Sequence, residues 1–111
     1  MGQERIGKVV ISPRVLKTIA RLTALSNPDV VRLALPGLFK FHIPSGGVAV
    51  RVEGNTVSIN LHIVANARAN MYELGRNIQK EITRAIQNIV GMQVKEVNVY
   101  IEGVGKSRSA S

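Results

Sequence analysis

Apolar and polar residues alternate strictly in the stretch VNVYIE near the end of the chain. Val97, Val99 and Ile101 fall on one side of an extended backbone, and the more polar residues between them fall on the other. This period of two predicts a β-strand with one buried face and one exposed face. The pattern leaves open whether the exposed face only meets solvent or binds a partner.

The same alternation occurs twice in the middle of the chain, over residues 48–53 and 57–63. A Gly-Asn pair follows the first of these runs, and such a pair is typical of the tight turn in a β-hairpin. Two shorter apolar runs, over residues 6–11 and 30–35, also predict strands. In the second run, Val31, Leu33 and Leu35 fall on one side of an extended backbone and Arg32 falls on the other.

A first amphipathic helix is predicted directly after the run at 6–11. Ser12 is suited to cap its N-terminus, and Pro13 suits the first helical position because a missing N–H costs nothing there. Apolar residues then recur at spacings of three and four up to about Leu25, as along a helix that buries one stripe. The stripe predicted to be buried consists of Val15, Leu16, Ile19 and Leu22.

A second, longer amphipathic helix is predicted after residue 69. Asn70 is suited to cap it, and Glu73 completes a pair of the capping-box type. Gly91 stands where helices commonly end in a left-handed residue. The apolar stripe predicted for this helix consists of Met71, Leu74, Ile78, Ile82, Ala85 or Ile86, and Ile89.

The predicted elements follow one another in the order β-α-β-β-β-α-β. Because the strands have one apolar face and two amphipathic helices are available to cover it, the predicted fold class is α+β. The arrangement is a two-layer sandwich with both helices on one face of a mixed sheet. The last strand follows a helical crossover and can therefore lie parallel to another strand. A chain of 111 residues fits a single domain, over residues 1–104, followed by a disordered polar tail at 105–111.

Helices on one side leave the polar face of the sheet to solvent or to another molecule, and the sequence favours neither alternative. The residues expected on this face are Arg51, Glu53, Ser58, Asn60, His62, Asn98, Tyr100 and Glu102. The candidates among them for contact with a protein partner are Arg51, Asn60, His62, Asn98 and Tyr100.

The stretch LFKFHIPSGG, over residues 38–47, contains both phenylalanines of the chain, Phe39 and Phe41. Its Pro-Ser-Gly-Gly end is typical of a flexible turn. The apolar residues of the stretch either fold back as a lid over one end of the core or form an exposed patch for self-association or partner docking. Phe39 and Phe41 are therefore further candidates for partner contact.

The formal net charge of +8 suits an acidic partner, which could be nucleic acid, anionic lipid or an acidic protein. Sheets that bind RNA stack bases on several aromatic residues, whereas the polar face here offers only Tyr100. The chain also has no GXXG loop and no RNP1-like run. Nucleic acid is therefore the second candidate, after a protein partner. Two basic rows on the predicted helices would supply its contacts, and the alternative is that both rows are ordinary solvated helix faces. The rows are Arg14, Lys17 and Arg21 on the first helix and Arg76, Lys80 and Arg84 on the second.

The chain offers little for catalysis or metal binding. It has no cysteine, which excludes disulfides and thiolate metal sites and agrees with a reducing cytoplasm. His42 and His62 are not at a paired metal-ligand spacing, and no serine stands in a nucleophile motif. We therefore expect a protein that is not an enzyme, with no catalytic residues, no cofactor and no metal.

The chain also shows no signal for insertion into a membrane. The charged N-terminus is not a secretory signal, and no apolar run approaches the roughly 20 residues that span a bilayer. Any membrane association is expected to be peripheral, through a partner.

Three segments resemble the alkaline shock protein family of bacteria, also called the Gls general stress family. The segment NIQKEITRAIQNIVGMQVKEVNVYIEGV is similar to the family's hallmark helix, Gly-containing turn and last strand. GKVVISPRVLKTIARLTAL is similar to its opening strand and Ser-headed helix, and VAVRVEGNTVSINLHIV to its central hairpin. The resemblance covers residues 7–104. The hallmark positions are Asn77, Ile78, Ile82, Gly91, Val94, Val97, Asn98, Val99, Ile101, Gly103 and Val104.

The resemblance implies a non-enzymatic cytoplasmic protein of the cell-envelope stress response and of envelope homeostasis. It implies self-association, and attachment of some members to the membrane by a separate integral membrane protein. It implies no cofactor and no small-molecule substrate. The chain departs from the family in its basic charge and in the separation of Tyr72 from Gly75, which bears on subfamily and partner.

Overall fold

The computed structural model describes residues 6–34 and 45–106 of the chain. This part contains two α-helices and four β-strands, with a short 3-10 turn before one strand and a π-helical turn after the second helix. In chain order the elements are α1 (Pro13–Leu25), β1 (Val30–Leu33), η2 (Ser45–Gly47), β2 (Val48–Glu53), β3 (Thr56–Asn66), α2 (Met71–Ala85), η3 (Ile86–Val90) and β4 (Gln93–Gly105).

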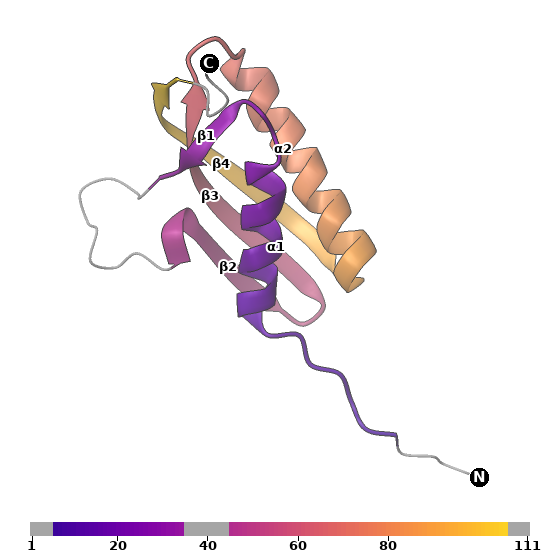
Figure 1. Cartoon of the computed structure of the whole chain (residues 1–111). Coiled ribbons are helices and arrows are strands. Elements are labelled where there is room, and N and C mark those ends of the chain that lie inside the picture. The colour runs from indigo at the N-terminus through magenta and orange to yellow at the C-terminus, as the bar shows by residue number, and fades with distance from the viewer. Residues whose placement is uncertain (1–5, 35–44, 107–111) are drawn as a thin grey trace.

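The sheet is built around β3, which pairs along both of its edges (Figure 1). β4 lies parallel to β3 over the whole length of that strand, from Thr56 opposite Gln93 to Asn66 opposite Gly105. β2 and β1 follow one another along the other edge, and both are antiparallel to β3. The sheet is therefore mixed, as predicted, because the crossover through α2 brings β4 back in the direction of β3.

Both helices cover the same face of the sheet, so one core lies between two layers (Figure 1). Every second residue of β3 from Val57 to Ile63 is buried, as alternation predicts for a strand with one dry face. The predicted fold class, α+β with two helices on one face of a mixed sheet, is confirmed. The largest fully buried side chains are Leu16, Val30, Val48, Val57, Ile59, Leu61, Ile63, Ile78, Ile82 and Ile86.

The helix ends lie where the capping residues predict them. The Ser12 hydroxyl oxygen accepts a hydrogen bond from the Arg14 backbone N–H at 3.1 Å. The Asn70 side chain likewise accepts one from the Glu73 backbone N–H at 3.0 Å. At the far end of the second helical stretch, Gly91 adopts a left-handed conformation with φ 80°.

The buried face of α1 differs from the predicted stripe. Leu16, Ala20 and Ala24 are fully buried, whereas Val15 and Leu22 are 46% and 57% exposed. Alanine lets the helix backbone come close to the layer beneath it, so the alanine side of α1 faces the core. The bulkier side is thereby rotated to the flank, and the prediction for Val15 and Leu22 is wrong.

The second helical stretch changes its winding at η3. Ile86 is buried, but Ile89 is exposed although the 3.6-residue period predicts it in the core. A π-helical turn has more residues per turn than an α-helix, so residues after it are rotated out of the α-helical stripe. This rotation explains why the prediction for Ile89 is wrong.

Residues 6–11 do not form the predicted first strand. The segment is extended but pairs with none of the described strands, and Ile6, Val9 and Val10 are 93%, 89% and 76% exposed. Only Ser12 separates the segment from α1, and Ser12 is occupied as the helix cap. The chain therefore has no loop there that could turn the segment back on to the sheet of its own copy.

Gly47 closes the connection between β1 and β2. Its φ is +92°, and a Cβ at this position would lie 2.5 Å from the carbonyl oxygen of Ala34. A side chain cannot occupy that space, so only glycine allows this close approach. Ala34 also donates its backbone N–H to the carbonyl oxygen of His62 at 2.8 Å, which fastens the end of β1 to β3.

The predicted strand over residues 30–35 is β1, Val30–Leu33. Residues 35–44 lie outside the described residues. The two alternatives for Phe39 and Phe41, a lid over the core or an exposed patch, therefore stay predictions.

Candidate functional site

The sheet face that points away from both helices, the outer face, gathers the polar residues of β2, β3 and β4. The register places Asn60 opposite Asn98 and His62 opposite Tyr100 on neighbouring strands. Side chains on one face of paired strands are neighbours, so the sheet joins residues that lie 38 to 40 positions apart. The structure brings together on this face Arg51, Glu53, Ser58, Asn60, His62, Asn98, Tyr100 and Glu102.

His62, Tyr100 and Glu102 form a connected group, the His62 cluster. The Nδ1 atom of His62 lies 2.6 Å from the Oε2 atom of Glu102. The imidazole also stacks on the Tyr100 ring, with 4.7 Å between the ring centroids and 14° between the planes. The carboxylate and the aromatic ring together fix the orientation of the histidine. Tyr100 remains exposed, so its ring is available to another molecule.

Asn60 and Asn98 form a second pair beside the His62 cluster. The Asn98 side-chain amide donates a hydrogen bond to the Asn60 side-chain oxygen at 2.9 Å. An asparagine side chain has two N–H donors and an oxygen with two lone pairs, so this bond leaves further capacity on both residues. The pair can therefore offer hydrogen-bonding groups of fixed position to a partner.

A hollow of about 360 Å³ lies beside the asparagine pair. Its lining carries charges of both signs, from Arg51 and Lys95 and from Glu53 and Glu96. Nucleic acid is bound by concentrated positive charge, whereas protein partners are recognised by complementary charges of both signs. The charge balance of the hollow therefore favours a protein partner.

Lys95 is an outer-face residue that the sequence pattern does not reveal, whereas its neighbour Glu96 lies on the side that the alternation of β4 predicts. β4 begins at Gln93, before the strict alternation starts, and its register with β3 shifts between Val57 and Ser58. This shift leaves Lys95 as an extra residue, and a bulge of this kind re-aims side chains. No sequence signal marks the bulge, so alternation alone could not place Lys95 on this face.

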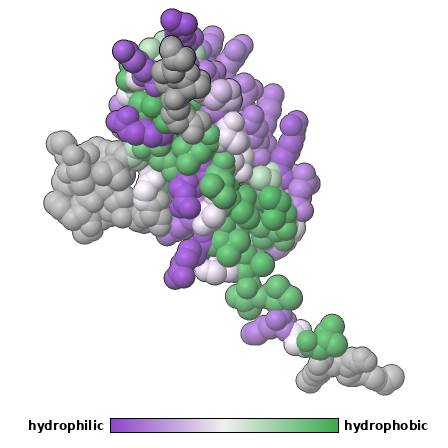
Figure 2. All heavy atoms as spheres, in the orientation of Figure 1, coloured by the Kyte–Doolittle hydropathy of each residue, from purple (hydrophilic) through white to green (hydrophobic). Residues whose placement is uncertain are grey.

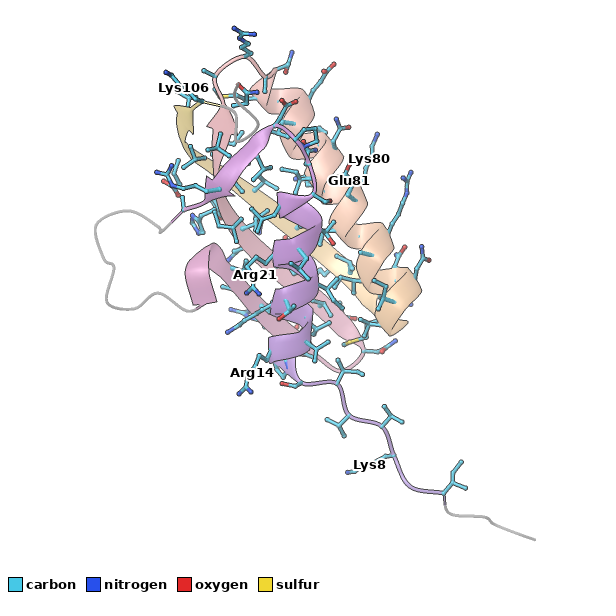
Figure 3. All side chains as sticks on the ribbon, viewed as in Figure 1. Lys8, Arg14, Arg21, Lys80, Glu81 and Lys106 are labelled. Atoms are coloured by element: carbon cyan, nitrogen blue, oxygen red, sulfur yellow. The ribbon has the colours of Figure 1, made fainter. Side chains whose placement is uncertain are left out.

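The two predicted basic rows lie on different sides of the helical layer. Figure 3 shows Arg14 and Arg21 projecting from α1 on the side away from α2, and Lys80 projecting from α2 away from α1. Lys17, the third member of the first row, is half-buried. The rows therefore do not combine into one basic surface.

The row on α2 lines its own hollow of about 470 Å³, which includes Arg76, Lys80 and Arg84. Arg76 is already engaged within the helix. Its guanidinium donates a hydrogen bond to the Tyr72 hydroxyl at 2.7 Å, lies 5.0 Å from the centroid of that ring, and also donates to Gln79. These contacts use N–H donors of Arg76 that would otherwise be available to bind an anion.

Other kinds of site have less support in the described part of the chain. Within residues 6–34 and 45–106, no three His, Cys, Asp or Glu residues are grouped so that they could hold a metal ion. Neither described helix has both the length and the apolar character needed to cross a bilayer.

Fold and surface together define the class: a small two-layer α+β domain whose polar sheet face is covered by none of the described elements. The fold is similar to that of MamM-CTD, with a TM-score of 0.54 and 11% sequence identity. The superposition covers 83% of this chain and 98% of that one. At this identity the similarity shows the fold alone.

The chain belongs to the alkaline shock protein 23 family, which has a cell envelope-related function, and the family model matches residues 1–106. It is 26% identical over 108 residues to the uncharacterised protein YloU of Bacillus subtilis, covering 90% of each chain. It is 25% identical over 108 residues to the uncharacterised protein Spy1535 of Streptococcus pyogenes serotype M6, covering 94% of this chain and 84% of that one. The family resemblance predicted from the motifs is thereby confirmed.

Proposed function

We propose that this protein is a non-enzymatic cytoplasmic interaction protein with a role in the bacterial cell envelope. It self-associates, and it binds a protein partner through the outer face. The family's cell envelope-related function supports the setting. The stress response and envelope homeostasis are the finer roles that we propose within that setting.

The observation that carries the proposal is the His62 cluster, in which Tyr100 is exposed, on a sheet face that no described element covers. Its side chains already hold one another in position, so a partner would have little side-chain freedom to remove on binding. Tyrosine is among the residues that contribute most to protein interfaces, and Tyr100 is exposed while its ring stacks on His62. The asparagine pair and the charges of the hollow would supply the polar contacts around it.

The pairing of His62 with Glu102 also resembles the base and its orienting carboxylate in a hydrolase. A hydrolase of that type needs a nucleophile within hydrogen-bond reach of the histidine. Ser58 lies four residues along the same strand, which corresponds to roughly 13 Å of extended chain. This separation supports an interaction role for His62 over a catalytic one.

We also propose that the protein is cytoplasmic and reaches the membrane through an integral membrane protein. The outer face is then the contact with that protein. Nucleic acid remains the alternative partner, through the basic helical rows. The separation of those rows and the mixed charge of the outer face favour the protein partner. A gel shift that persists near physiological salt would support nucleic acid instead.

The experiment is to express Tyr100→Ala and Tyr100→Phe in the native host and measure the fraction of protein that sediments with membranes. We expect Tyr100→Ala to lower that fraction several-fold and Tyr100→Phe to retain it, because phenylalanine keeps the ring that stacks on His62. Lys80→Ala, on α2, is the control for a surface substitution elsewhere.

Equal melting temperatures for the variants would show that the fold is intact. A membrane fraction unchanged by Tyr100→Ala would contradict the role of the outer face.

A further inference from the structure

Residues 6–11, which we call the arm, are mostly apolar and extended, and none of the described strands pairs with them. Figure 2 shows apolar side chains over the lower end of the helical layer and continuing along the arm. Among the exposed apolar residues are Ile6, Val9 and Val10 of the arm. The arm is rich in β-branched residues, which fit a strand better than a solvated coil.

The arm cannot easily pair with β4 of its own copy. α1 packs over β1 and β2, whereas β4 lies at the opposite edge of the sheet, under α2 (Figure 1). Ser12 caps α1 and Pro13 begins it, so no connecting loop exists between the arm and the helix. The arm accordingly extends away from the body of the molecule (Figure 1).

The outer edge of β4 is free to receive a strand. Among the described strands, β4 pairs only with β3. Gln79 of α2 donates its side-chain N–H to the carbonyl oxygen of Val97 at 3.0 Å and also lines the groove beside β4, which places this oxygen on the edge away from β3. Because backbone groups alternate in direction along a strand, those of Val99 and Ile101 face the same open edge. No side-chain hydrogen bond like that of Gln79 is seen at these two positions of the described chain.

A groove of about 400 Å³ runs between this edge and α2. Its apolar lining includes Met71, Val99 and Ile101. Gly75 also lines it, and a Cβ there would meet nothing within 4 Å, so the groove is open at that point. In an added strand, Val9 and Ile11 would point to the groove side, and Lys8 would point to the outer face, where Glu102 lies.

The free edge of β2 is a poorer receiver. The side of α1 that lies over β2 carries Arg14 and Arg21 (Figure 3). An apolar arm that also carries Lys8 would meet these cations there. The groove beside β4 has one cation in its lining, Arg76, and its guanidinium is hydrogen-bonded to Tyr72 and Gln79. The apolar side chains of Met71, Val99 and Ile101 are therefore left for the arm. The residues around the two edges therefore favour the edge of β4 as the place where the arm binds.

We propose that the arm of one copy adds as a strand to the β4 edge of a second copy, with Val9 and Ile11 in the groove under α2. The inference rests on the proposed function in one respect, since it names the second copy as the partner in self-association. Reciprocal exchange of arms gives a dimer, and one-way addition gives an open chain. The arm–edge contact is the same in both.

Size-exclusion chromatography with light scattering, over a range of protein concentrations, tests the contact from both sides. Val9→Asp charges the arm without disturbing the core, because Val9 is exposed in the single copy. Gly75→Leu fills the groove without a backbone clash. We expect each to weaken self-association by at least about tenfold. Asn55→Asp in the β2–β3 turn and Gln87→Leu in η3 are the matched controls, and both should associate like the wild type.

Cysteine cross-linking identifies the edge, because the chain has no cysteine of its own. A Lys8→Cys copy is mixed with a Glu102→Cys copy under mild oxidation, and in a second mixture with an Arg51→Cys copy. We expect a disulfide between copies in the first mixture only. Cross-linking to Arg51→Cys instead, or closure within one chain that carries both Lys8→Cys and Glu102→Cys, would overturn the inference.

The remaining outcomes separate this inference from the proposed function. If Val9→Asp and Gly75→Leu each self-associate as strongly as the wild type, self-association uses another surface. The arm inference is then wrong, while the proposed function stands. A wild-type monomer at all concentrations overturns the arm inference and self-association together. Partner binding by the outer face is judged separately, by the membrane-sedimentation experiment.

Discussion

β3 and the arm are both apolar stretches suited to a strand, yet they have opposite environments. In β3, alternate residues from Val57 to Ile63 are fully buried between the sheet and two helices. In the arm, most of the apolar surface is open to water. β3 has a strand on each edge and helices over one face, whereas the arm has neither. The comparison shows that a β-branched, apolar segment is buried when other strands pair with its edges and helices cover its face. Its composition alone does not bury it.

The largest effect is expected where β3 is most enclosed. Ile59→Ala removes a fully buried side chain beneath the helices and should lower the free energy of unfolding by about 2–5 kcal/mol. Val9→Ala in the arm should change it by less than about 0.5 kcal/mol in the monomer. Urea unfolding of both variants at low protein concentration measures the difference. Equal losses would mean that the arm is packed in solution.

A second pair of substitutions sharpens the comparison within α1. Ala20→Leu inserts a large side chain where the helix packs closely, and should cost about 1–3 kcal/mol. Leu22→Ala, on the exposed flank, should cost much less. The two melting temperatures check this order. If Leu22→Ala proves the more damaging, the core-facing side of α1 is the one that periodicity predicts.

The polar side chains on the outer face of β3 and β4 should contribute less to stability than the buried side chains on the inner face of β3. Asn98→Ala removes the hydrogen bond to Asn60 at a partly exposed position and should cost about 1 kcal/mol or less. Chemical denaturation gives the value directly. A loss as large as that of Ile59→Ala would show that the polar network supports the fold as strongly as the core does.

The smallest effect is expected to be a gain. Gly75 lies inside α2 with open space around it, so Gly75→Ala should raise the free energy of unfolding by about 0.4–1 kcal/mol. Thermal unfolding detects the shift. A decrease would mean that the groove beside β4 needs glycine for the fold itself, and not only for access by a second copy.

Most of the fold follows from local patterns. Alternation located β2, β3 and the C-terminal half of β4, and capping residues located the beginnings of both helices. The outer-face residues also followed from alternation, because every strand that contributes to that face keeps the period of two over most of its length. The part of the site that could be predicted is the part in which the strands are regular.

The rest depends on interactions between distant segments. The bulge that places Lys95 on the outer face arises from the pairing of β4 with β3, and nothing local encodes it. The face that α1 buries was decided by how closely Ala20 and Ala24 allow it to approach the sheet. The arm has a sequence that suits a strand, but a strand forms only when it pairs with the open edge of another strand. The sequence does not tell which open edge the arm can reach.

The close approach of Gly47 to Ala34 has a consequence for the variation that this fold can tolerate. The contact holds the two ends of the 35–44 connection at one point beside β3. Chain-closure entropy grows only with the logarithm of length, so doubling this connection would cost only about 0.6 kcal/mol. The relative position of β1 and β2 is therefore expected to depend on the contact between Gly47 and Ala34, and only weakly on the number of residues that connect the two strands.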